Sequence, residues 1–389
     1  MSSAIKNKNK AKINLKQYGM MFALIVIFLI FSALSSGKNL SAMNINNLVM
    51  QNSYVVILAI GMLLCIITGN VDLSVGSVVA FTGALCAILV LDKGFPILAS
   101  FAIILVVGLI IGMWQGFFIA ALGVPPFIVT LANMLIFRGL TLTILNGQTK
   151  GPLPTGYTQV GAGYLPVLKT GNFDLISVIA GIVGSIAVII IEMNNIKKKK
   201  KYNFAIPPFW QTLLKLVVII GLLNFFTIKL AAYSGLPFVL LIMLVLILLY
   251  SFITGRMVVG RQIYAVGGNK KAAALSGIKT NKVMFWVYAN MGLLCGLAGI
   301  VLSARNASAT PKAGDGFELD AIASCYIGGA SAYGGTGTVF GAVVGALIMG
   351  VLNNGMSLIG WSVDLQKVVK GLVLLGAVTV DLISKTKKK

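Results

Sequence analysis

Few side chains in this 389-residue chain could carry out chemistry. Only nine are acidic and none is histidine. Histidine is the commonest general base and metal ligand, so its absence excludes a Ser–His–Asp triad and most metal chemistry. The four cysteines each lie in an apolar stretch, without the spacing of metal ligands or of a disulfide framework. The sequence therefore predicts no catalytic residue, no metal site and no cofactor bound by this chain.

Two charged residues interrupt otherwise apolar runs. Asp72 has only Asn70 and Ser74 as close polar neighbours in the sequence, and Arg138 follows Asn133 by five residues. A charge at the centre of a bilayer costs about 2.5–3.5 kcal/mol, so each charge needs a partner, a cavity or an interface. Asp72 suits either a helix N-cap, which we favour, or direct substrate contact. An ion pair between Arg138 and an acid such as Asp72 is a further hypothesis.

The candidate translocation pathway consists of these polar residues within apolar surroundings: Asn70, Asp72, Asn133 and Arg138.

Nucleotide-binding motifs are missing from the sequence. The phosphate loop G-x-x-x-x-G-K-[ST] occurs nowhere, and GGNKK at 267–271 lacks its spacing. Any use of ATP must therefore come from another chain.

Composition indicates an integral membrane protein. Hydrophobic residues make up 58% of the chain and charged residues only 10%, against about 25% charged residues in a soluble domain. The net charge of +22 comes from lysines and arginines in the gaps between apolar runs. Membrane proteins concentrate such residues in cytoplasmic loops, and no gap is long enough to hold a nucleic-acid-binding domain. We expect membrane lipid as a partner, and no nucleic acid.

The predicted fold is an all-α polytopic membrane protein with about twelve transmembrane helices (10–14), some of them broken or short. Each candidate span approaches the roughly 20 apolar residues that a crossing requires. The twelve runs are Tyr18–Leu34, Tyr54–Thr68, Val75–Leu91, Ile97–Leu122, Phe127–Leu145, Phe173–Ile191, Phe209–Thr227, Leu236–Ile253, Val283–Ser303, Leu319–Ala332, Thr338–Leu352 and Val368–Ile383.

The basic clusters predict the orientation. With a cytoplasmic N-terminus at 1–17, alternation places Lys197–Lys201, the loop 255–282 and the tail 384–389 on the cytoplasmic side. Residues 18–383 then form the transmembrane domain, and both termini are cytoplasmic. The first span could instead be a signal peptide, because small residues follow its apolar core.

Three polar, glycine-rich or proline-rich segments separate apolar runs: 69–74, 123–126 and 328–341. Non-helical backbone at membrane depth is tolerated only inside protein or beside a water-filled cavity, and such breaks often mark substrate pathways. We expect burial for 69–74 and 328–341. For 123–126, burial and a tight surface turn are equally supported.

The loop 255–282 is the most informative segment. Lys270–Leu275 should form a short helix, with Asn269 as its N-cap and Gly277 at its end. A short helix between two spans suits the docking of a peripheral subunit. The alternative is an amphipathic helix lying on lipid headgroups.

The string GRQIYAVGGNKKAAALSGI at 260–278 resembles the cytoplasmic coupling segment of permeases in bacterial monosaccharide ABC importers of the ribose, galactose and xylose type. GNVDLSVGSVVAFTGAL, GVPPFIVTLANMLIFRGLTLTI and the glycine-rich run from Gly328 agree with it. The segment of about 146–234 departs from the shorter members and adds two apparent spans. In this it is similar to the longer xylose or multiple-monosaccharide permeases.

The resemblance implies a permease of the bacterial cell membrane that imports a monosaccharide such as xylose, ribose or galactose. It implies a second permease chain in a homodimer, an ATPase subunit that uses ATP and Mg, and an extracytoplasmic sugar-binding protein. By matched position, the surface coupled to the ATPase is Arg261, Gly267, Asn269, Ala273, Leu275, Ser276 and Gly277.

Two alternatives remain open from sequence. One is an ABC permease for another small solute, such as a nucleoside or a branched amino acid. The other is an ion-coupled secondary transporter that uses Asp72, Glu318 or Asp320 as its ion site.

Overall fold

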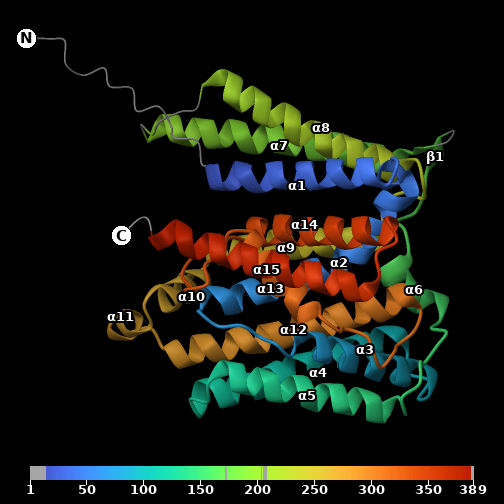
Figure 1. Ribbon diagram of the computed structural model, residues 1–389, viewed down its shortest axis with the longest axis vertical. Helices are drawn as coiled ribbons and strands as arrows, with labels where there is room; N and C mark the ends of the chain where they lie inside the picture. The colour runs from blue at the N-terminus through green and yellow to red at the C-terminus, as the bar shows by residue number, and fades with distance from the viewer. Residues whose placement is uncertain (1–14, 171–172, 203, 205–207, 387–389) are drawn as a thin grey trace, which may run out of the picture. The chain divides into compact units, whose positions relative to one another are not determined.

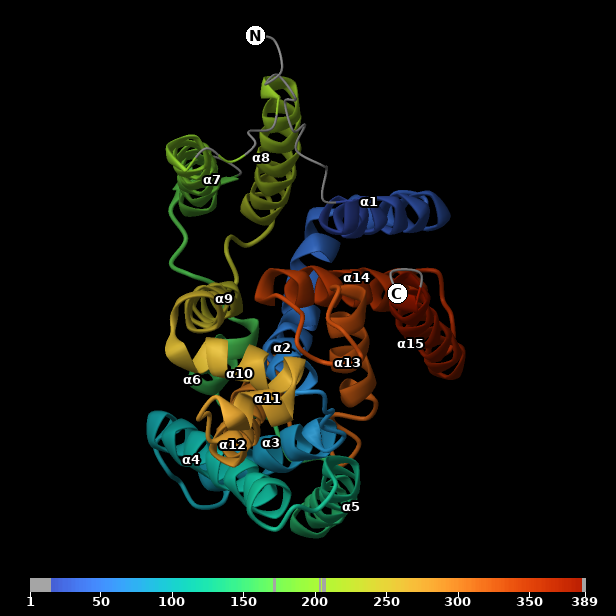
Figure 2. The same cartoon turned by 90° about the vertical axis from the view of Figure 1, so that its left-hand side faces the viewer.

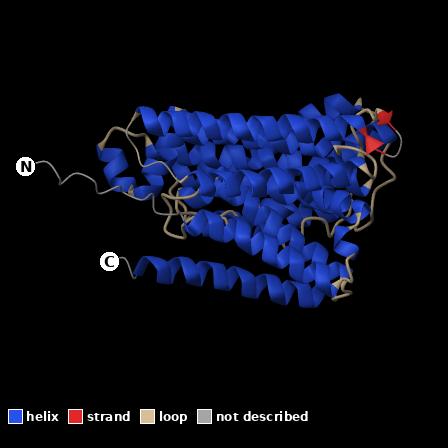
Figure 3. Ribbon diagram, turned by 90° about the horizontal axis from the view of Figure 1, so that it is seen from above, coloured by secondary structure: helices blue, strands red, loops and turns tan. Residues whose placement is uncertain are grey.

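The computed structural model describes residues 15–170, 173–202, 204 and 208–386. These residues form fifteen α-helices and two strands of two residues each, which confirms the all-α prediction (Figures 1 and 3). The basic residues before Leu15 and the last three lysines lie outside the described residues.

The first nine helices are α1 Leu15–Leu34, α2 Ala42–Ile67, α3 Val75–Leu91, α4 Ile97–Gly116, α5 Pro126–Ile144, α6 Thr155–Ala162, α7 Leu175–Lys201, α8 Phe209–Ala231 and α9 Phe238–Arg256. The remaining six are α10 Val258–Gly268, α11 Lys270–Leu275, α12 Thr280–Asn306, α13 Phe317–Ile327, α14 Val339–Leu358 and α15 Val363–Thr386. A 3-10 turn, η1 Lys38–Leu40, follows α1, a π-helical turn, η2 Phe117–Ala121, extends α4, and β1 Lys169–Thr170 pairs antiparallel with β2 Phe173–Asp174.

Eight of the described helices are long and apolar enough to cross a membrane, and Gly19–Leu34 and Val75–Leu91 are shorter apolar helices. Every predicted span contains a helix, but they are not equally long. The predicted span Leu319–Ala332 is wrong, because α13 ends at Ile327 after 11 residues. A helix of that length is roughly 16 Å long and cannot cross a hydrocarbon core of about 30 Å.

Two further boundaries differ from expectation. The lysine block Lys197–Lys201 was predicted as part of a gap, but it forms the last turns of α7. Cationic side chains there complement the carbonyl end of the helix dipole. The loop 255–282 contains two helices, α10 and α11, where the sequence predicted one.

The chain divides into two compact units. The first contains Tyr164–Leu236 and Leu40–Asn46, and its main element is the antiparallel pair α7 and α8 (Figure 1). Lys215 of α8 forms an ion pair with Glu192 of α7 at 2.6 Å, and Asn224 donates to the Ser185 hydroxyl at 2.8 Å. Most apolar side chains of this hairpin are exposed, as expected for helices that lipid surrounds.

The second unit contains Gly19–Asn39, Asn47–Gly163 and Pro237–Lys389, and its core surrounds α12. Figure 2 shows α12 beside α3 and α4, and α6 also packs on it. The α4–α12 contact depends on small residues, since a Cβ on Gly292 would overlap the carbonyl oxygen of Gly108. Close approach through glycine is a common way to pack helices in lipid.

Candidate functional site

The three polar interruptions of the sequence meet at one pocket of about 300 Å³ in the second unit. Asn70 and Val71 line it from the α2–α3 break, and Pro125 and Pro126 line it from the segment before α5. Tyr326, at the end of α13, and Ala332 complete the wall. Segments that are far apart in the sequence are therefore brought together at the points where their helices are broken.

Burial differs among these interruptions. Asp72 and Ser74 are almost fully buried, as expected for 69–74. In 328–341, Ala330 and Ser331 are buried, whereas Tyr333 is exposed. In 123–126, Gly123 and Pro125 are exposed while Val124 and Pro126 are half-buried, which agrees better with the surface-turn interpretation.

Asp72 makes local hydrogen bonds. Its Oδ1 accepts from the backbone N–H of Ser74 at 2.9 Å and from the Ser74 hydroxyl at 2.6 Å, and the Gln115 amide donates to the same hydroxyl. Because α3 begins at Val75, Asp72 is not the N-cap residue but closes an Asx turn just before the helix. In the described part of the chain no ion pair involves Asp72. These contacts are those of a structural carboxylate.

Arg138 does not pair with Asp72, so that hypothesis is wrong. Its Nη1 donates to the carbonyl oxygens of Pro311 and Ala313, at 3.0 and 2.6 Å. The guanidinium therefore ties α5 to the segment between α12 and α13. Asn133 is buried on α5, and its amide nitrogen has no hydrogen-bond partner among the described residues. Of the four candidate pathway residues, only Asn70 lines the pocket.

The coupling segment has the predicted short helix, α11 Lys270–Leu275. The Asn269 side chain caps it by accepting from the N–H of Ala272 at 2.9 Å. Gly277 ends it with φ +84°, and Ile278 donates back to Ala273 as in a Schellman motif. Leu275 is 91% exposed, at the end of this helix.

The seven residues proposed for coupling divide into two groups. Five are exposed: Arg261, Asn269, Leu275, Ser276 and Gly277. Ala273 is the buried residue of α11. Gly267 faces inward, and a Cβ there would overlap the carbonyl oxygen of Ile67 at the end of α2.

This inward contact joins the coupling segment to the pocket walls. The N–H of Gly335 also donates to the Ile67 carbonyl oxygen, at 2.8 Å. One turn before Gly267, the Tyr264 hydroxyl donates to the carbonyl oxygen of Gly337 at 2.6 Å. Helix α10 therefore touches both the α2 end and the α13–α14 break, which supply pocket residues. The sequence offers one indication of this contact, since Tyr264 lies in the string at 260–278 that resembles the family's coupling segment.

The sequence does not show that a second polar cluster forms, because its partners are far apart in the chain. The Lys370 ammonium on α15 pairs with buried Asp320 on α13 at 3.0 Å, and Asn353 of α14 donates to the same carboxylate at 3.4 Å. Nearby, Lys367 bonds to Asp315 at 2.8 Å, and this hydrogen bond lowers the pKa of Asp315. The available signal was a lysine within the predicted apolar run from Val368.

Comparison with known proteins agrees with these features. Residues 44–378 match the family model described as the permease component of the branched-chain amino acid transport system. The xylose transport system permease XylH of Haemophilus influenzae is 40% identical over 383 residues, covering 96% of this chain and 98% of that relative. XylH of Escherichia coli K12 is 40% identical, with 97% and 94% covered. The ribose import permease RbsC of Escherichia coli K12 is 36% identical, with 93% and 92% covered.

No solved structure matches the chain. The family match extends from α2 into α15 and so includes both the coupling segment and all three interruptions. The chain therefore belongs to this permease family, as a non-catalytic, multi-pass membrane subunit of an ABC transport system.

Proposed function

We propose that the sugar carried through this ABC-type import permease is a pentose, with xylose as the first candidate. The main support is the near-complete alignment with xylose permeases, at 40% identity over 96–97% of the chain. Ribose permeases align at 36% or less over slightly shorter stretches, which supports ribose as the second candidate.

The proposed topology has about twelve membrane segments between residues 18 and 383, with 1–17, 255–282 and 384–389 in the cytoplasm. The basic clusters support this orientation. Helix α13 is too short to cross alone. Together with the break that follows it, α13 would return the chain to the side of the coupling segment, where Tyr264 and Gly267 contact that break. A Ser276→Cys variant tests the sidedness. A membrane-impermeant thiol reagent should label it only in inverted vesicles, since the four native cysteines are buried, and labelling in intact cells would contradict the orientation.

The proposed mechanism begins at the exposed face of α10 and α11. A partner ATPase, which uses ATP and Mg, would dock on Leu275 and its exposed neighbours. Because Gly267 and Tyr264 contact the α2 end and the α13–α14 break, a displacement of α10 would move the walls of the 300 Å³ pocket. Asn70 would line the pathway, with Asn133 beside it, while Asp72 and Arg138 would position its walls.

Two permease chains would form one conduit, and an extracytoplasmic sugar-binding protein would deliver the sugar. The pathway itself needs few polar side chains, because the binding protein would supply the specificity for the sugar. Within the segment 146–234, the hairpin α7–α8 would supply the two spans that distinguish this permease from shorter relatives.

The experiment measures uptake of a labelled pentose in cells that express the chain with its ATPase and binding protein. A second measurement is the amount of ATPase that co-purifies with the permease. Leu275→Asp should abolish uptake and reduce retained ATPase by more than about tenfold, because it places a charge in an apolar contact. The matched control is Leu168→Asp, which is also exposed but lies in the first unit.

Retained ATPase and full uptake in Leu275→Asp would contradict the docking surface. Uptake driven by an ion gradient without the ATPase would contradict the whole mechanism. Efficient uptake of a different sugar, with neither xylose nor ribose competing, would contradict only the pentose.

A further inference from the structure

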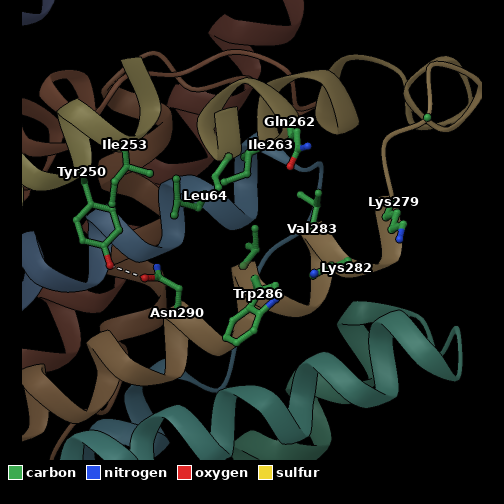
Figure 4. A pocket seen from close by; sticks show the side chains of 13 residues that line it. Leu64, Tyr250, Ile253, Gln262, Ile263, Lys279, Lys282, Val283, Trp286 and Asn290 are labelled. Carbon is green, nitrogen blue, oxygen red and sulfur yellow. Dashed lines mark hydrogen bonds between the residues drawn. The ribbon is translucent and has the colours of Figure 1, made fainter. Parts of the chain in front are cut away.

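A pocket of about 710 Å³ lies beside the coupling segment in the second unit, and Gly277 of the proposed coupling surface is one of its lining residues. The transport mechanism above assigns no occupant to it. Helices α2, α9, α10 and α12 form its walls, together with the residues that join α11 to α12 (Figure 4). Leu64, Ile253 and Ile263 make one side apolar, and the half-exposed indole of Trp286 lies opposite.

The two ends of this pocket differ. Figure 4 shows Lys279 and Lys282 at one end and the Tyr250–Asn290 pair at the other. Both lysines are exposed, and none of the ion pairs among the described residues includes them. The sequence contains no acidic residue between Glu192 and Asp315, so the segment around the pocket has no internal counter-charge.

A buried donor also lacks a partner here. Asn290 accepts a hydrogen bond from the Tyr250 hydroxyl through its Oδ1, while its Nδ2 has no partner among the described residues. Asn290 lines the end of the pocket away from the two lysines, so it lies beside the apolar part of an occupant and not its headgroup.

We propose that this pocket binds one anionic phospholipid, with the phosphate between Lys279 and Lys282 and an acyl chain along the apolar wall toward Asn290. The occupant must be anionic to complement two unpaired ammonium groups, and largely apolar to fill the remaining walls. The lipid would also touch Gln262 and Ile263 of α10, so its presence would bear on the coupling segment itself.

The test uses the full chain with Trp286 as its only tryptophan, obtained by Trp114→Phe, Trp210→Phe and Trp361→Phe. The protein is reconstituted into phosphatidylcholine vesicles that contain an equal small fraction of brominated phosphatidylglycerol or brominated phosphatidylcholine. Bromine quenches nearby indole fluorescence, so the difference between the two lipids reports headgroup-selective binding beside Trp286.

Phosphatidylglycerol should quench at a concentration about tenfold lower than phosphatidylcholine, and Lys279→Gln with Lys282→Gln should remove that preference. The matched control, Lys270→Gln with Lys271→Gln, removes the same charge from α11 outside the pocket and should keep the preference. Retention of phosphatidylglycerol in native mass spectra of the chain with all its tryptophans gives a second measurement, independent of the triple substitution.

Equal quenching by both lipids, or a preference unchanged in Lys279→Gln with Lys282→Gln, would overturn the proposal. In a further arm, inorganic phosphate is added as a competitor, and short-chain phosphatidylglycerol is compared with the long-chain lipid. If phosphate removes the preference and the short-chain lipid binds as well as the long-chain lipid, the site binds free phosphate, and the lipid proposal is overturned. Both measurements report binding alone, so they stand apart from the test of pentose transport.

Discussion

The interrupted centre of the second unit and the α7–α8 hairpin of the first have similar hydropathy but opposite surroundings. The most apolar stretch of α2 is 89% buried inside protein, whereas the corresponding stretch of α8 is 6% buried. Apolar side chains meet protein in the first case and face outward, as toward lipid, in the second. Hydropathy alone cannot distinguish these environments, because lipid tails are as apolar as leucine.

The two regions also differ in what fixes their geometry. In the centre, backbone atoms of α2, α10 and the α13–α14 break touch directly at Ile67, Gly267 and Gly335. In the hairpin, side-chain pairs such as Glu192–Lys215 join two otherwise regular helices. Substitutions should therefore be far more damaging in the centre than at equivalent positions of the hairpin.

The largest expected contrast is between two ion pairs. Lys370→Met leaves Asp320, which is 2% exposed, with an uncompensated carboxylate, and should destabilise the protein by about 3 kcal/mol. Lys215→Met breaks the more accessible Glu192 pair of the hairpin and should cost below about 1 kcal/mol. Thermal unfolding in one detergent measures both. Equal losses of stability in the two variants would contradict the expected difference between the centre and the hairpin.

A smaller contrast is expected between glycines. Gly267→Ala places a methyl group against the Ile67 carbonyl and should destabilise by roughly 1–3 kcal/mol and impair transport. Gly221→Ala in the hairpin meets open space and should be neutral or stabilising by up to about 1 kcal/mol, since alanine favours helix. Gly268→Ala, also in open space, is the control within α10. Wild-type uptake by Gly267→Ala would show that α10 is not held against α2.

Local sequence patterns were enough to predict most helices. The bounds of α3 and of α11 agree with the expected Val75–Leu91 and Lys270–Leu275, because apolar length, an Asn cap and a terminating glycine are local signals. The end of α13 was missed because the predicted span continued through Gly328 and Gly329. The helix ends there, since Gly329 has φ +83° and Ala330 donates back to Cys325 as in a Schellman motif.

Contacts between distant segments could not be predicted in the same way. An acid was one hypothesis for the partner of Arg138, but its guanidinium donates to two backbone carbonyl oxygens, and a sequence does not show which carbonyl oxygens are available. The Lys370–Asp320 pair joins residues 50 positions apart. The sequence does not show how α13 and α15 align. It therefore cannot predict that Lys370 pairs with Asp320 rather than with Asp315 or Glu318.

Two substitutions of Asp72 test whether this buried carboxylate in the centre is structural or takes part in transport. Asp72→Asn keeps an oxygen that can accept from the Ser74 N–H and hydroxyl, so it should change stability by less than about 0.5 kcal/mol and preserve uptake. Asp72→Ala removes that acceptor from a buried site and should cost about 1–2 kcal/mol. Unfolding and uptake of both variants decide the role. Loss of uptake in a stable Asp72→Asn protein would restore Asp72 as a direct participant in transport.

The smallest expected effect lies in the hairpin, at the N-cap of α7. Burial alone would raise the pKa of Asp174. Hydrogen bonds from the Ser177 hydroxyl and from the N–H groups of Ser177, Leu168 and Ile176 outweigh it and lower the pKa below its ordinary value. Since the folded pKa is the lower one, this contribution to stability is fully present above about pH 4 and is lost as the pH falls through the folded pKa.

Asp174→Asn keeps a capping oxygen but cannot ionise, so it should cost about 1 kcal/mol or less at neutral pH and make hairpin stability less sensitive to acid. Fluorescence of Trp210 on α8 follows melting of the hairpin, and wild type and variant should converge once the pH falls below the folded pKa of Asp174. An unchanged acid response in the variant would assign the sensitivity to another carboxylate, with Glu192 as the remaining acid of the hairpin. Because the hairpin is held by such side-chain contacts, even its best-bonded acid should matter less than Asp320 does in the centre.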